Sequence, residues 1–169
     1  MKNILGDFET KIASVNSALE KNGIQPDELS QLDHLAYRVE SFDRYQEMKE
    51  TLAGIAFKLD ETMVAGRPIA VFELHSYIQS GGWTIPYIEL PAPKDGSPYG
   101  EGLEHAEFVV VGSLDQFQKR HQDLPFATKA LDRTLNPELG LKTDIAAIKF
   151  HEQPIGAVVR TEQRLAKSP

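Results

Sequence analysis

LDHLAYRVESFDRY (residues 32–45) and LEHAEFVVVGSLDQF (residues 103–117) are two versions of one pattern, and together they decide the fold. Each opens with a leucine, an acidic residue and a histidine, and continues with alternating side chains that are typical of a strand. A serine that suits a helix N-cap, Ser41 or Ser113, follows each strand and precedes an amphipathic segment. This internal repeat predicts a chain built from two related modules.

Further strands are expected in both halves. In the first half, alternation and turn residues predict strands at 56–60, 69–75 and 84–90, with a turn at Gly81-Gly82. In the second half, residues 146–151 form the last clear strand. The pattern predicts an α+β fold of two βαβββ-like modules, joined by a connector rich in Pro and Gly over residues 91–102.

Both ends of the chain read as helical. Apolar residues at steps of three and four predict a helix over residues 3–22, followed by a short turn at Pro26. Pro154 is expected to begin a terminal helix, although GAVVRT (residues 156–161) also reads as a strand. We expect one domain over residues 1–169, with four parts: an arm (1–30), module one (31–93), module two (94–151) and a C-terminal helix (152–169).

Composition narrows the class of protein. With 169 residues, 41% of them hydrophobic and 25% charged, the chain can bury a core as one domain. A net charge of −7 argues against nucleic-acid and anionic-membrane partners, and no apolar run approaches the roughly 20 residues of a membrane span. The absence of cysteine excludes disulfides, thiolate zinc sites and a cysteine nucleophile, and it suits the cytoplasmic location that we expect.

Each predicted strand has one apolar face and one face with groups unusual for a core. These groups are His34, Arg38, Glu73, His75, Glu89, His105, Glu107, Lys149 and His151. One interpretation is a solvent-facing side of the sheet, which antiparallel sheets often have. The other is a polar cavity, because imidazole and carboxylate together are the ligand set for zinc, manganese, iron or nickel. No HExxH-type spacing supports a metal locally.

Several stretches between residues 32 and 151 resemble the YecM-like family, within the vicinal oxygen chelate superfamily of glyoxalase I, fosfomycin-resistance proteins and extradiol dioxygenases. They are LDHLAYR, AGRPIAVFELH, YIELPAP, GLEHAEFVV, TLNPELGL and IAAIKFH. The resemblance implies that two βαβββ modules form a cup-shaped mixed sheet, with extra helices at the N- and C-termini. It also implies metal ligands on the first and last strands of each module.

The positions that match these ligands are the first strand of each module and the last strand of module one: His34, His105 and Glu89. In the last strand of module two, alternation points Lys149 and His151 inward, where the superfamily usually has a carboxylate. The resemblance therefore implies either a three-ligand site or one completed by His151. Glu162 is a further candidate ligand only if GAVVRT is a strand.

The resemblance implies a metal-dependent enzyme that acts on a small oxygen-rich molecule through a divalent ion (Zn, Mn, Ni or Fe), with no reaction assigned. Glu107, two residues after His105, is expected to act as a general base or to orient His105, and Lys149 to act with it in catalysis. Arg38, Arg67 and His75 are the candidate substrate-binding residues.

Two other classes of function stay open. The same cup would suit a non-catalytic protein that binds a small molecule or an anion without metal. Alternatively, the helix at residues 3–22 would dock a partner, and the cup would serve only as a scaffold. Because both modules lie within one chain, the sequence is compatible with a monomer or a homodimer.

Overall fold

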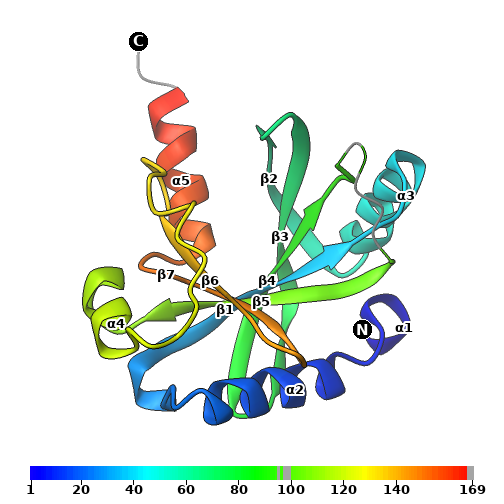
Figure 1. Ribbon diagram of the computed structural model, residues 1–169. Coiled ribbons are helices and arrows are strands. Elements are labelled where there is room, and N and C mark those ends of the chain that lie inside the picture. The colour runs from blue at the N-terminus through cyan, green and yellow to red at the C-terminus, as the bar shows by residue number, and fades with distance from the viewer. Residues whose placement is uncertain (95, 97–99, 167–169) are drawn as a thin grey trace.

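The computed structural model describes residues 1–94, 96 and 100–166, and one mixed sheet dominates these residues (Figure 1). Its seven strands lie in the order β2-β3-β4-β1-β5-β7-β6. The strands are β1 (Leu29–Arg38), β2 (Ala56–Val64), β3 (Arg67–Ser80), β4 (Trp83–Pro91), β5 (Gly102–Val110), β6 (Glu138–Lys142) and β7 (Ala147–His151). The helices are α1 (Lys2–Leu5), α2 (Phe8–Lys21), α3 (Phe42–Ala53), α4 (Leu114–Arg120) and α5 (Ile155–Ala166), with a 3₁₀ turn at Pro26–Glu28.

The two modules meet at the centre of the sheet. Strands β1 and β5, which carry the repeated sequence, pair with each other in antiparallel fashion. On its other side each has a parallel neighbour, β4 beside β1 and β7 beside β5. The predicted α+β class, with two related modules and a mixed sheet, is confirmed.

Module two has one strand fewer than module one within residues 100–166. Between α4 and β6 the chain is irregular and contributes only an isolated bridge between Ala127 and Gly140. Strand β6 itself was not predicted as a separate strand, because five residues with a central glycine carry little alternation. Parts of two predicted segments, residues 95 and 97–99 of the connector and 167–169 of the terminal helix, lie outside the described residues.

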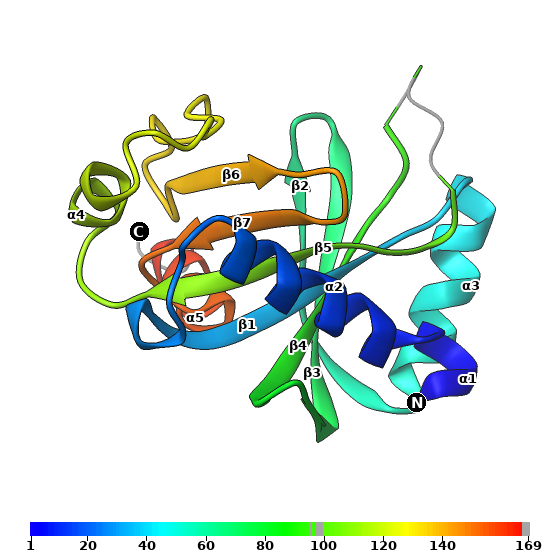
Figure 2. The same ribbon diagram turned by 60° about the horizontal axis from the view of Figure 1, so that its bottom comes forward.

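Helix α2 covers one side of the central strands, and α5 lies on the other side (Figures 1 and 2). The apolar side chains of α2 and the central strands form the core, together with an aromatic cluster at Phe108, Phe117 and Phe150. Both predicted caps are present, since Ser41 accepts from Arg44 N at 3.1 Å and Ser113 from Gln116 N at 3.3 Å.

At the ends of the chain one expectation is corrected, and the expected terminal helix is confirmed as α5. The predicted helix at 3–22 is two helices, because Gly6 has a φ of 75° and Asp7 caps α2 by accepting from Thr10 N. The strand reading of GAVVRT is wrong, since these residues lie in α5. No helix in the described part of the chain has the length and apolar character needed to span a membrane.

Candidate functional site

A cavity of about 260 Å³ lies between the sheet and α5 and draws residues from both modules. Its polar floor consists of His34, Glu89, His105, Glu107 and Lys149. Part of its wall is apolar and comes from α5, namely Ile155, Val158 and Val159. These five residues therefore line a polar cavity, as the second interpretation predicts, and do not form a solvent-facing side of the sheet.

Two β-bulges lie directly before the histidines that line the cavity, His34 and His105. Between Leu32 and His34 the register shifts by one residue, so that Asp33 is the extra residue on β1. A second shift makes Glu104 the extra residue on β5, directly before His105. A bulge re-aims side chains, and here each acid contacts Nδ1 of the histidine that follows it: Asp33 Oδ2 lies 2.9 Å from His34 Nδ1, and Glu104 contacts His105 in the same way.

The Nε2 atoms of both histidines face one carboxylate. Glu107 Oε1 lies 2.8 Å from His105 Nε2, 3.4 Å from His34 Nε2 and 2.8 Å from Lys149 Nζ. Glu89 Oε2 lies 3.3 Å from His34 Nε2. The side chain of Glu107 is only 3% exposed, so these donors take the place of water around a buried negative charge.

The cluster shifts the pKa values of its members. Burial lowers the pKa of His34, but the charge of Glu107 and hydrogen bonds with the surrounding carboxylates raise it well above its ordinary value. Burial raises the pKa of Glu107, but Lys149 and His34 hold it well below its usual range. The pKa of Glu89 is likewise lowered, against burial, by its hydrogen bond with His34. In this arrangement a cationic His34 stands between ionised carboxylates.

Three of these residues lie close enough together to share one metal ion. One ligand atom each of His34, Glu89 and Glu107 lies within 4.8 Å of the others. Two ligands at about 2.1 Å from one ion, at a tetrahedral angle, lie about 3.4 Å apart. The measured separations of 3.3 and 3.4 Å from His34 Nε2 agree with that spacing. The acids behind both histidines are also the usual outer partners of metal-bound imidazole.

The predicted ligands are thus only partly brought together. His34 and Glu89 belong to this group, whereas His105 reaches it by a hydrogen bond to Glu107. Glu107, expected as a base or as the partner of His105, lies within the ligand group itself. Glu162, on α5 rather than on a strand, still lines the cavity, one helical turn after Val158 and Val159.

His151 lies outside the residues that line the cavity, although its Nε2 lies on the side of Asp33 and Glu107. It is fully buried, and its Nδ1–H donates to Gln153 O at 2.6 Å. Its Nε2 has no hydrogen-bond partner and lies 3.7 Å from Asp33 Oδ2 and 3.8 Å from Glu107 Oε2. Burial lowers its pKa, which favours the neutral ring. With Asp33 and His34, His151 forms a second group of side chains that could hold a metal ion, so its expected role as a ligand stays a prediction.

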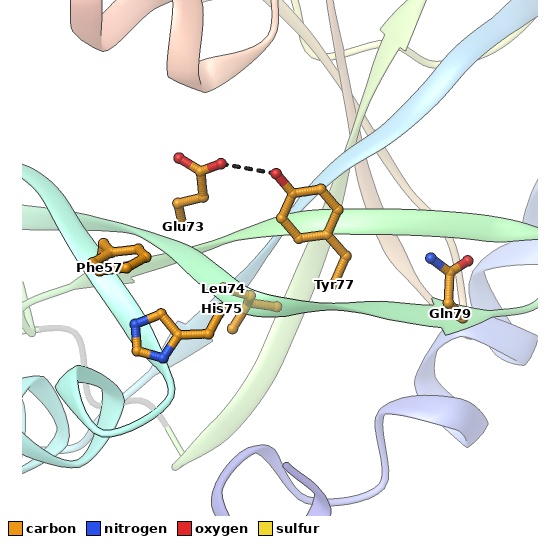
Figure 3. A pocket seen from close by; sticks show the side chains of 6 residues that line it. All are labelled: Phe57, Glu73, Leu74, His75, Tyr77 and Gln79. Atoms are coloured by element: carbon orange, nitrogen blue, oxygen red, sulfur yellow. Dashed lines mark hydrogen bonds between the residues drawn. The ribbon is translucent and has the colours of Figure 1, made fainter.

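Of the three expected substrate-binding residues, two line the cavity and one lies elsewhere. Arg38 and Arg67 line the cavity, with Arg38 Nε 3.2 Å from Glu104 Oε2 and an Arg67 guanidinium nitrogen donating to Ala92 O at 2.9 Å. His75 does not. Its exposed ring lies edge-on to Phe57 in a separate hollow, where Tyr77 donates to Glu73 (Figure 3).

The position of His75 follows from the length of β3. Alternation continues along this strand, since Leu74 and Ile78 are buried while Glu73, His75 and Tyr77 line the same hollow. Of this strand, the cavity takes Arg67, Ile69 and Val71, so His75 lies farther along the strand, beyond the cavity. Sequence reasoning also missed the roles of Asp33 and Glu104, although the acid before histidine in both repeats was the available signal.

The comparisons agree with this architecture. The family described as YecM protein matches residues 1–135. Protein YecM of Escherichia coli strain K12 is 26% identical over 179 residues, which cover 96% of this chain and 94% of that protein. An uncharacterized protein of Haemophilus influenzae is 34% identical over 80 residues, which are 47% of this chain and 42% of that protein.

Solved structures extend the likeness to the fold. The structural-genomics protein EC4020 has a TM-score of 0.79 at 27% identity, with 96% of this chain and 92% of that chain covered. Methylmalonyl-CoA epimerase of Streptomyces coelicolor, in complex with 2-nitronate-propionyl-CoA, has a TM-score of 0.55 at 16% identity, with 74% and 98% covered. The epimerase likeness shows the vicinal oxygen chelate fold alone, and the match over residues 1–135 shows that the chain belongs to the YecM protein family.

Proposed function

We propose that this protein is a metal-dependent enzyme of the vicinal oxygen chelate type that acts on a small oxygen-rich molecule. The observation that carries the proposal is the position of His34 Nε2, 3.3 Å from Glu89 Oε2 and 3.4 Å from Glu107 Oε1. Ligands of a tetrahedral divalent ion with bonds of about 2.1 Å have this spacing. One imidazole with two carboxylates suits zinc, manganese, iron and nickel.

His34, Glu89 and Glu107 would hold the ion, and His105 would orient Glu107. When bound, the ion supplies Lewis acidity to a substrate oxygen. Lys149 is drawn toward the floor by Glu107, which raises its pKa against the effect of burial, so its ammonium is available to neutralise a developing negative charge. Arg38 and Arg67 would bind anionic parts of the substrate, and the apolar wall of α5 would exclude water.

The size of the cavity supports a small substrate. A space of about 260 Å³ is at the lower end of ligand pockets and has no room for a whole coenzyme A ester. The epimerase relative was solved with 2-nitronate-propionyl-CoA, whose reactive part is a small acyl group. We therefore propose a compact compound with neighbouring oxygen atoms as the substrate, with its reaction still to be assigned by assay.

Metal binding tests this function directly. The protein, purified without chelator, is equilibrated in turn with zinc, manganese, nickel and iron(II), and bound metal is measured after dialysis. We expect one ion per chain in the parent and in His75→Asn, a matched control whose ring lies outside the cavity. Binding should be lost in His34→Asn and in Glu89→Gln. A parent that binds none of the four ions would falsify the proposal.

A second function is favoured by one specific observation. Lys149 Nζ lies 2.8 Å from Glu107 and 3.3 Å from Glu138, so a cation of the protein itself already balances part of the acidic floor. The cavity would then bind a small molecule or an anion without metal. In that case a ligand that raises the melting temperature should do so equally with and without chelator.

A further inference from the structure

Asp33 joins two parts of the molecule that are far apart in sequence. The residue is fully buried, and each of its oxygens accepts hydrogen bonds. Oδ1 accepts from Gln31 Nε2 at 2.8 Å, and Oδ2 accepts from His34 Nδ1 at 2.9 Å and from Ile155 N at 2.8 Å. One carboxylate oxygen therefore holds both the candidate ligand and the first residue of α5.

The start of α5 is fixed close to His34 by a second contact. A Cβ atom at Gly156 would lie 2.8 Å from Tyr87 Cζ, so the helix packs on the tyrosine ring without a gap. Tyr87 is in turn the Cα partner of His34 in the pairing of β1 with β4. From this anchored end, Val158 and Val159 form the apolar wall of the cavity.

The corresponding acid of module two has no such link. Glu104 contacts His105 Nδ1 as Asp33 contacts His34, but its side chain is 39% exposed and its other side-chain partner is Arg38. Both acids come from equivalent bulges in the repeat. The difference isolates the contact with α5 as the feature particular to Asp33.

We propose that Asp33 is a positioning residue that couples the α5 wall of the cavity to the orientation of the His34 ring. The proposal rests on the proposed function, in which His34 Nε2 is a metal ligand. A displacement of the first turn of α5 moves Ile155 N, the Asp33 carboxylate follows, and the ring loses the partner that keeps Nε2 aimed at Glu89 and Glu107. A molecule that presses on the α5 wall would thereby act on the metal site.

The link can be cut without touching a candidate ligand. Ile155→Pro removes the N–H that donates a hydrogen bond to Asp33, and proline is well tolerated at the first position of a helix. Ile155→Val is the matched control, because it keeps the N–H and most of the apolar side chain. Asp33→Asn removes the charge behind His34, and Glu104→Gln is its counterpart in module two.

Zinc affinity is the first measurement, with zinc alone as the probe. We expect Asp33→Asn to bind zinc roughly 10- to 100-fold more weakly than the parent, in the range found for outer partners of metal ligands. Ile155→Pro should fall in the same direction, Ile155→Val should match the parent, and Glu104→Gln should show a smaller loss than Asp33→Asn. A parent that binds zinc, with Ile155→Pro and Asp33→Asn equal to it, overturns the coupling and leaves the proposed function standing.

The second measurement does not depend on metal. In the metal-free protein the His34 Nδ1 proton, hydrogen-bonded to Asp33, should give a slowly exchanging downfield proton resonance in NMR spectra. We expect that resonance in the parent and in Ile155→Val, and its shift or loss in Ile155→Pro. An unchanged resonance in Ile155→Pro overturns the coupling, whether or not the parent binds a metal ion. A parent that binds none of the four ions defeats the proposed function, so the two failures can be told apart.

Discussion

The two modules place opposite charges at equivalent points of the sheet. In module one, Glu89 of β4 is paired with Ala36, two residues after His34. In module two, Lys149 of β7 is paired with Glu107, two residues after His105. By this register Lys149 stands where module one has a carboxylate, and Glu107 stands where module one has an alanine.

The difference shows how a repeated fold can gather one asymmetric site. The hydrogen bonds between strands are made by the backbone, and they pair equivalent positions in both modules. Different side chains can therefore stand at equivalent positions without changing the fold. In module one the carboxylate, Glu89, lies on the last strand, β4, whereas in module two the carboxylate, Glu107, lies on the first strand, β5. There Glu107 is paired with His34 of β1 and contacts its side chain. The candidate ligand group thus takes two residues from module one and one from module two, with Lys149 as its counter-charge.

The largest expected effect is that of Glu107→Gln. Removing this carboxylate leaves Lys149, His34 and His105 without their shared partner, and breaking a buried pair in this way costs about 3–5 kcal/mol of the free energy of unfolding. Glu89→Gln, which is less central to the cluster, should cost less. Urea unfolding of both metal-free variants checks this order, and equal losses would contradict the central role of Glu107.

Lys149→Met tests whether the cation of module two balances the charge of Glu107. Without the ammonium, Glu107 keeps His34 and Glu138 keeps Arg133, but each carboxylate loses one charged partner, so the metal-free variant should be less stable than the parent. Its metal affinity should rise, because no protein cation competes for Glu107. Glu89→Lys, which gives module one the residue of module two, should abolish metal binding. Calorimetric titration with zinc checks both, and weaker binding by Lys149→Met would sink the assignment of Lys149 as a counter-charge.

The pH dependence should follow His34. Because its folded pKa is raised, its protonated form stabilises the metal-free protein fully below about pH 6.5, and this contribution is lost as pH rises through the raised value. A metal at Nε2 displaces that proton, so zinc affinity should rise with pH until the pH passes the raised pKa of His34 in the folded protein. Zinc affinity is measured at several pH values in the parent and in His105→Asn. If His34 causes the pH dependence, the variant should keep it. An affinity that does not change with pH in the parent argues against His34 as a ligand.

The smallest expected effects compare the helix caps of the two modules. Ser41→Ala and Ser113→Ala should each cost about 1 kcal/mol of stability. We expect the larger loss at Ser41, whose bond to Arg44 N is 3.1 Å against 3.3 Å at Ser113 and whose helix has 12 residues against 7. Thermal unfolding measures both; a larger loss at Ser113 would reverse this ranking.

Much of the fold could be read from local signals. The repeat, the serine caps and the turn at Gly81-Gly82 are short-range features, and the structure has all three. One error and one open alternative arose where a local signal was weak or ambiguous. Gly6 was a break inside an otherwise periodic helix, and GAVVRT fits both a strand and a helix.

By itself, the sequence determined the two-module α+β fold, the caps and the set of polar residues on the strands, because these depend on periods and turns within a few residues. The tertiary structure alone decided which polar residues meet. Bulges at Asp33 and Glu104 change which way side chains point, and they arise from pairing between β1 and β5, which are distant in sequence. For the same physical reason, the contact between Asp33 and α5 spans 122 residues and left no local signal.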